Sequence, residues 1–231
     1  MQKRGLAALG LTVINLCLPM PGAMAKDLPF APPRKKEVAP IVFSPYEHEA
    51  LTATLDLGWE PAERMMMPNK FMIMKFIPKG EDPEWPQKMV NFVSYLGGET
   101  KGDARDYMIS TQKASEKFAP KGTLSWDVIS GDNPNDVMFE YSVKNFKDAP
   151  DQFEIQRAIK GRDGLHVVIY HLGDAEVADA QRQKIISWLK TSVKIITKDQ
   201  FLGTTSGAKK DAIVGPPVKP AVSASTAATT K

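Results

Sequence analysis

The clearest structural pattern in the sequence is "QFEIQRAIKGRDGLHVVIYHL", residues 152–172. Two runs rich in apolar and β-branched residues flank a short Gly-Arg-Asp-Gly segment, a pattern typical of a β-hairpin. We expect a type I turn with a G1 bulge, which places Gly164 in the left-handed region. This turn sets Lys160 opposite His166.

The predicted register sorts the side chains of the hairpin by polarity, because neighbouring residues on a strand point to opposite faces. A symmetric two-residue turn would mix polar and apolar side chains on both faces, so we favour the bulged form. The expected core face carries Phe153, Ile155, Ile159, Leu165, Val167 and Ile169. The expected polar face carries Glu154, Gln156, Lys160, His166 and Tyr170.

The hairpin also holds two of the three histidines, His166 and His171. Strand alternation sends them to opposite faces, so they cannot bind one ion together. Gln156, His166 and Tyr170 are candidates for a polar binding patch, and a solvated outer face explains the same pattern. Arg157 falls on the apolar face, where it needs a carboxylate partner, because an unpaired buried charge is costly. A position at the margin of the sheet is the alternative.

Residues 1–25 predict a secretory signal peptide. A basic start is followed by the apolar run "GLAALGLTVINLCL", and Ala23-Met24-Ala25 has the small-x-small pattern of a cleavage site. An uncleaved N-terminal anchor is the alternative, although the run is short for a membrane span. We therefore expect an exported protein, periplasmic or extracellular, that begins at Lys26 and has no transmembrane span. Cleavage removes Cys17, the one cysteine, and with it any disulfide.

The flanks of the predicted domain are basic and the domain is not. The net charge of +3 becomes +1 once the two basic residues of the signal are removed. Residues 26–40, a Pro- and charge-rich linker, contribute +2, and residues 203–231, a Pro/Ala/Ser/Thr tail expected to be disordered, contribute +3. Residues 41–202 therefore carry −4, which argues against a nucleic-acid partner.

The strands and helices expected elsewhere in the sequence predict a single domain at residues 41–202. Strands and helices are grouped, which predicts the α+β class: an antiparallel sheet of about five or six strands covered by helices, with a long C-terminal helix. In chain order we expect strands at 51–57 and 70–78, helices at 86–96 and 104–120, strands at 123–131, 136–143, 152–160 and 165–172, and a helix at 175–197.

This layout resembles that of the PsbP-like group of secreted or lumenal α/β/α domains. The resemblance is carried by "QRAIKGRDGLHVVIYHL" followed by "AQRQKIISWLKTSVKI". It covers about half of the predicted domain and consists of pattern without a diagnostic motif. Members of that group are mostly non-enzymatic binding or assembly factors, which implies a similar role here.

A methionine-rich stretch, "ERMMMPNKFMIMK", is the second candidate site. Thioether sulfurs suit Cu(I), and methionine also fills irregular gaps in apolar cores. The candidate ligands are Met65, Met66, Met67, Met72 and Met74. No spacing characteristic of a copper site is present, so core packing is the favoured interpretation.

No motif in the sequence indicates a particular reaction. The chain has no nucleophile elbow and no His-Glu-x-x-His helix, and the expected mature chain has no thiol. Carboxylate-based hydrolysis leaves no local signature and stays an alternative. We therefore expect an exported, non-enzymatic binding or accessory protein that contacts a protein or a small ligand without a cofactor. Trp59, in the loop "DLGWEP", is a further candidate contact residue.

Overall fold

The computed structural model describes residues 38–43, 46–56, 58–67, 71–95, 102–145, 150–200 and 213–214. The predicted signal peptide lies outside these ranges, as do most of the predicted linker and tail. Where the linker and tail are described, residues 38–40 and 213–214 belong to strands. Within the described ranges no helix has the length and apolar character needed to cross a membrane.

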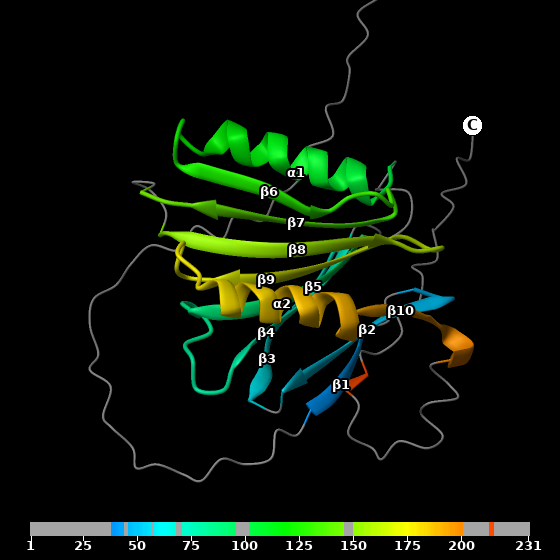
Figure 1. Ribbon diagram of the computed structural model, residues 1–231. Coiled ribbons are helices and arrows are strands. Elements are labelled where there is room, and N and C mark those ends of the chain that lie inside the picture. Colours follow the sequence, from blue (N-terminus) through cyan, green and yellow to red (C-terminus); the bar gives the residue numbers. More distant parts are fainter. Residues whose placement is uncertain are drawn as a thin grey trace, which may run out of the picture.

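The centre of the molecule is a seven-stranded antiparallel sheet with the strand order β3-β4-β5-β9-β8-β7-β6 (Figure 1). Neighbouring strands follow one another along the chain except at the centre, where β5 pairs with β9. The strands are β3 (Trp59–Met67), β4 (Phe71–Pro78), β5 (Lys88–Tyr95), β6 (Leu124–Ser130), β7 (Asp136–Val143), β8 (Gln152–Lys160) and β9 (Leu165–Leu172).

A smaller sheet with the order β10-β2-β1-β11 joins segments that are far apart in the sequence. The β1–β2 hairpin is antiparallel, β10 pairs with β2, and the two residues of β11 run parallel to β1. These strands are β1 (Val38–Phe43), β2 (Glu49–Asp56), β10 (Lys194–Thr197) and β11 (Ile213–Val214).

Two helices lie against opposite faces of the large sheet. Helix α1 (Ala104–Phe118) packs on β6, β7 and β8. It begins with a capping box, in which Asp103 and Asp106 each accept a hydrogen bond from the other's backbone N–H. Helix α2 (Asp179–Ser192) crosses in front of the sheet in Figure 1 and contacts β8 and β2.

Both faces of the large sheet are therefore buried. One core lies between this sheet, the small sheet and α2, and the other lies between the sheet and α1. Residues of the first core include Phe43, Leu51, Met72, Phe92, Ile155, Val168 and Leu189. Residues of the second core include Met108, Phe139, Ala158, Leu165 and Val167.

The predicted fold class is wrong. Within the described ranges the chain is mostly antiparallel β, with one sheet of seven strands and another of four. The expected sheet of five or six strands covered by helices, with a long C-terminal helix, does not describe this architecture. The expected strands at 51–57, 70–78, 123–131, 136–143, 152–160 and 165–172, and the expected helix at 104–120, are confirmed to within two residues at each end.

The helix expected at 86–96 is a strand. Residues 88–95 form β5, which pairs with β4 on one side and β9 on the other. Phe92 contributes to one core and Val93 to the other, so both faces of this strand need apolar side chains. A strand buried on both faces loses its alternation, and the remaining apolar run was mistaken for helical periodicity.

The long C-terminal helix is also shorter than expected. Helix α2 begins after Ala178 and ends at Ser192, and Lys194–Thr197 then forms β10. Ile195 and Ile196 pair with Leu51 and Ala50 of β2. Their β-branched side chains favour a strand, and the edge of β2 supplies the hydrogen-bond partners.

The predicted register of the hairpin is off by one residue. The structure pairs Lys160 with Leu165 and Ala158 with Val167, as the symmetric turn requires. The prediction assumed that one face of the sheet meets water. Because both faces are buried, the mixture of polar and apolar side chains on each face does not disfavour the symmetric register.

The two glycines of this turn provide space for neighbouring side chains. Gly164 is not at positive φ, contrary to the prediction. A Cβ at Gly164 would lie 2.1 Å from the Tyr46 hydroxyl oxygen and 2.5 Å from the Tyr95 carbonyl oxygen. A Cβ at Gly161 would lie 2.3 Å from a carboxylate oxygen of Glu49. Close approach, and not backbone conformation, requires glycine at both positions.

We expect Gly164→Ala to lower the free energy of unfolding by about 1–3 kcal/mol, the usual cost of overpacking. The matched control is Gly58→Ala, because a Cβ at Gly58 meets nothing within 4 Å. Urea unfolding of both variants measures the difference. Equal midpoints for the two variants would contradict the close approach at Gly164.

Candidate functional site

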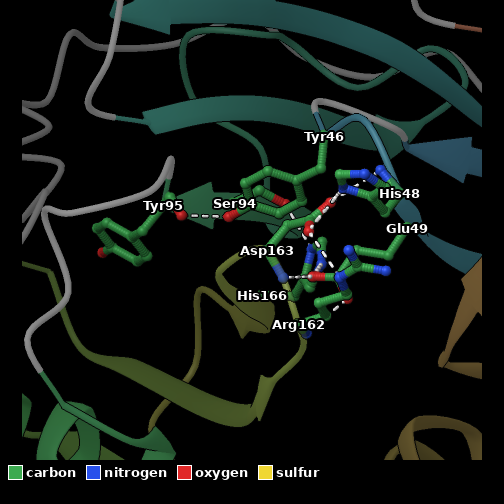
Figure 2. Close-up of polar contacts among 8 residues, drawn as sticks. All are labelled: Tyr46, His48, Glu49, Ser94, Tyr95, Arg162, Asp163 and His166. Carbon is green, nitrogen blue, oxygen red and sulfur yellow. Dashed lines mark hydrogen bonds and ion pairs between the residues drawn. The ribbon is translucent and has the colours of Figure 1, made fainter.

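His166 lies on β9 and is fully buried where the large sheet meets the small one. Its Nε2 is 3.2 Å from Oε1 of Glu49, the first residue of β2. A carboxylate can only accept, so the imidazole donates this hydrogen bond. The Ser94 hydroxyl, on the adjacent strand β5, lies 2.7 Å from Nδ1. His166 therefore connects the two sheets through Glu49 (Figure 2).

The β8–β9 turn and the start of β2 hold each other by reciprocal hydrogen bonds. The backbone N–H groups of Arg162 and Asp163 donate to the Glu49 carboxylate at 2.7 and 3.1 Å. In return, the backbone N–H of His48 donates to Asp163 at 2.8 Å, and the His48 imidazole lies 3.1 Å from the same carboxylate. Figure 2 shows both carboxylates between the two segments.

Tyr46 covers this network from the side. Its ring meets the His166 ring edge to face, with 4.9 Å between the centroids. Its hydroxyl donates to the Tyr95 carbonyl beside Gly164. Burial, with the nearby charges of Glu49 and Asp163, raises the pKa of the Tyr46 phenol well above its ordinary value, so the hydroxyl stays protonated as a donor.

The second buried carboxylate, Glu154, lies on the opposite face of the sheet. It accepts from the Tyr141 hydroxyl at 2.6 Å, from the Gln156 amide at 2.8 Å and from His171 Nδ1 at 3.2 Å. The Tyr107 hydroxyl, on α1, donates to the Gln156 carbonyl oxygen at 3.1 Å. The prediction that the two hairpin histidines point to opposite faces is confirmed, since each has its own glutamate.

Both glutamates are held in the ionised form by their donors. Burial alone would raise the pKa of the Glu49 carboxyl, but the hydrogen bonds from His166, Arg162 and Asp163 outweigh it and lower the pKa. Burial likewise acts to raise the pKa of Glu154, and the bonds from His171, Tyr141 and Gln156 lower it. Each carboxylate is thus engaged in holding the fold together.

The structure separates the residues of the predicted polar patch. His166 and Tyr170 do share a face, but that face is the one covered by the small sheet and α2. Tyr170 contacts the rings of Trp59 and Trp188 edge to face, with centroids 5.9 and 6.0 Å away. Burial, with the charges of Asp56 and Glu81, raises the pKa of Tyr170 to about 12.

Gln156 lies on the other face of the sheet, beneath α1, and is buried. It pairs across the hairpin with Ile169, whereas the one-residue shift of the prediction placed it on the face of His166. The interpretation of His166 and Gln156 as outward-facing is therefore wrong. A sheet covered on both sides has no solvated central face.

The five methionines of the candidate copper site do not share one face of the sheet. Strand β3 places Met65 and Met67 on one face, opposite Ile73 and Phe71 of β4. Met66 lies on the other face, opposite Met72. Met72 and Met74 are core residues with 0% and 4% of their surface exposed, whereas Met65 and Met66 are exposed.

The expected carboxylate partner of Arg157 is confirmed. The guanidinium donates two hydrogen bonds, at 2.9 and 2.7 Å, to Asp136 of β7. It also donates to the carbonyl oxygens of Leu189 and Val193 at the end of α2, at 2.5 and 3.0 Å. A cation at a helix C-terminus is favourable, so Arg157 fixes α2 on the sheet.

A groove of about 740 Å³ opens where α2 begins. Its floor and walls come from the α1–β6 connection, the paired ends of β6, β7 and β8, and the segment between β9 and α2. The lining residues are Gly122, Thr123, Leu124, Ser125, Ser142, Lys144, Phe153, Ala175, Glu176, Val177 and Ala178.

The sequence gives no signal for this groove. Residues 175–178 were expected to be the first turn of a helix, and they are extended loop instead. Residues 124 and 125 pair with residues 143 and 142 in the sheet, and the groove lies between this pair of strands and residues 175–178. The groove is accessible and has a size typical of ligand sites.

The lining of the groove mixes polar and apolar groups, and the polar groups contribute the larger share. Phe153 and Val177 supply apolar surface and belong to or pack against the first core. Lys144 Nζ lies 3.1 Å from Glu176 Oε1, and the Glu176 side chain is 83% exposed. Ser142 is 8% exposed, and among the described residues its hydroxyl has no hydrogen-bond partner.

Comparison with known proteins found no matching family model and no match among the curated proteins. The resemblance to PsbP-like domains therefore stays a prediction. Among the residues that the structure describes, no group of three or more His, Cys, Asp and Glu side chains is placed to hold a metal ion.

We expect acid to weaken the fold through Glu49 and Glu154. Their folded pKa values lie below 4.5, so their stabilising contribution is complete above that pH and is lost as the pH falls through the lowered values. Glu49→Gln should unfold more easily at neutral pH, by about 1–3 kcal/mol, and should depend less on pH in the acid range.

The control for this measurement is Glu63→Gln, at an exposed position of β3. Free energies of unfolding from urea titrations, between about pH 3 and pH 7, give the comparison. An acid dependence in Glu49→Gln as steep as in Glu63→Gln would contradict the role of Glu49.

Proposed function

We propose that this chain is an exported, non-enzymatic binding protein whose contact site is the groove at the start of α2. The observation that carries the proposal is the groove itself: an accessible hollow of about 740 Å³ whose lining mixes polar and apolar groups. A hollow of this volume is within the range of small-molecule sites. Export is inferred from residues 1–25 alone.

The state of the ionisable side chains supports binding over carboxylate-based hydrolysis. Glycoside hydrolysis uses two carboxyl groups facing one substrate. The groove is lined by a single carboxylate, Glu176, which is paired with Lys144. Glu49 and Glu154 are buried on opposite faces of the sheet and accept hydrogen bonds from the fold.

The arrangement of the methionines likewise supports binding over copper transport. A Cu(I) site needs sulfur atoms that converge on one point. Strand pairing divides the methionines between the two faces of the sheet, and Met72 and Met74 are enclosed in the core. The proposed site therefore uses none of the predicted metal ligands.

The proposal predicts that filling the groove abolishes binding. Ser125 is an exposed residue of β6 that lines the groove, so Ser125→Trp should fill the hollow without disturbing the core. The matched control is Val128→Trp, at a position on the same strand that is 45% exposed and faces the other side of the sheet.

The measurement is affinity purification of each full-length variant from its native source, with mass spectrometry of the proteins and small molecules that copurify. We expect a specific component to be recovered with the wild type and with Val128→Trp, and to be lost with Ser125→Trp. Recovery of the same components with both variants would refute the groove as the contact site.

A further inference from the structure

We infer that the groove binds a carboxylate group, held by Lys144, the Ser142 hydroxyl and the amino end of α2. This inference rests on the proposed function and specifies the ligand class of the same site. The ligand would be an organic acid or the C-terminus of a peptide, with an apolar group next to the carboxylate.

Ser142 is the residue that points to a ligand. It lies on β7 between Ser125 of β6 and Phe153 of β8, and all three line the groove. The residue is 8% exposed, and among the described residues no protein group bonds to its hydroxyl. The hydroxyl oxygen is not one of the described buried atoms that lack a partner, so it is accessible. Because Ser142 lines the groove, a ligand oxygen there is a fitting acceptor for this hydroxyl.

Lys144 provides the positive charge. It follows β7 two residues after Ser142, so the two side chains lie on the same side of the strand. Its present partner, Glu176, is 83% exposed, and ion pairs this exposed contribute little free energy. A ligand carboxylate that enters the groove can therefore replace Glu176 at the ammonium group at small cost.

Helix α2 starts at the groove, and its amino end has no side-chain cap. Ala178, the N-cap residue, lines the groove and has no group that could bond to the first-turn N–H groups. The helix is 14 residues long, and its dipole favours an anion at this end. The dipole thus acts in the same direction as Lys144 and Ser142.

The charges around the groove favour a carboxylate over a phosphate. Lys144 is the one basic residue that lines it, whereas Glu176 lines it too and Asp179 occupies the first turn of α2. A single cation can neutralise one negative charge, and a dianion would be repelled by the acidic neighbours. Leu124, Phe153 and Val177 leave apolar surface for the group next to the carboxylate.

The test compares an acid with its amide, which has nearly the same shape and no charge. The full chain labelled with ¹⁵N is titrated with N-acetyl-leucine, with N-acetyl-leucinamide, and with the peptide acetyl-Ala-Ala-Leu in its acid and amide forms. We expect the acids to shift the amide resonances of Ser142, Lys144 and Ala178, and the amides to leave them unchanged. A stronger response to the peptide acid would identify a peptide C-terminus as the source of the carboxylate, and a stronger response to N-acetyl-leucine would identify a small organic acid.

Two substitutions with opposite expected effects on the affinity for the acids test the inference further. Lys144→Gln should weaken binding of the acids about tenfold, because it removes a charge-assisted hydrogen bond. Glu176→Gln should tighten binding about twofold to fivefold, because it frees the ammonium group from a competitor. Lys113→Gln, at an exposed position of α1, changes the net charge equally and should have no effect.

Equal binding of acid and amide at the groove would overturn the carboxylate inference and leave the proposed binding function standing. Equal affinities of Lys144→Gln and Lys113→Gln for the acids would also overturn it. A groove that responds to none of the four probes would overturn the inference as well, and the comparison of Ser125→Trp with Val128→Trp would then decide the proposed function separately.

Discussion

The arrangement of the two sheets depends on the carboxylate of Glu49. Glu49 is the first residue of β2 in the small sheet, and its carboxylate accepts hydrogen bonds from His166 and from the backbone of the β8–β9 turn in the large sheet. An ionised carboxylate buried without donors would be very costly, so the fold supplies several of them. Gly161 and Gly164 lack side chains because Glu49 and Tyr46 occupy that space.

Glu154, on the other face of the sheet, is also a buried carboxylate with several donors: His171, Tyr141 and Gln156. The hairpin of β8 and β9 therefore supplies a histidine to each of two buried networks. One network fixes the small sheet, and the other holds Gln156 in place beneath Tyr107 of α1. The buried polar residues of the hairpin thus stabilise the two layers that cover it.

The groove arises because α2 is shorter than expected and begins at Asp179, so that the residues before it are not helical. Its last turn is fixed by Arg157, and Trp188 donates to the Thr54 carbonyl of β2 at 2.7 Å. The segment before the helix, residues 175–178, is loop and forms a wall of the groove. The groove therefore depends on where the helix is anchored, which explains why no local motif marks it.

Patterns between near neighbours in the sequence predict much of the local structure: the strands at 70–78, 152–160 and 165–172, the helix at 104–120, and the opposite directions of His166 and His171. These features depend chiefly on local composition and on the alternation of side chains along a strand. Long-range packing sets the register of the hairpin, the strand character of β5 and β10, and the pairing of the two histidines with Glu49 and Glu154. A strand that is buried on both faces carries no alternation to read, and a carboxylate more than a hundred residues from its histidine leaves no trace in the local pattern.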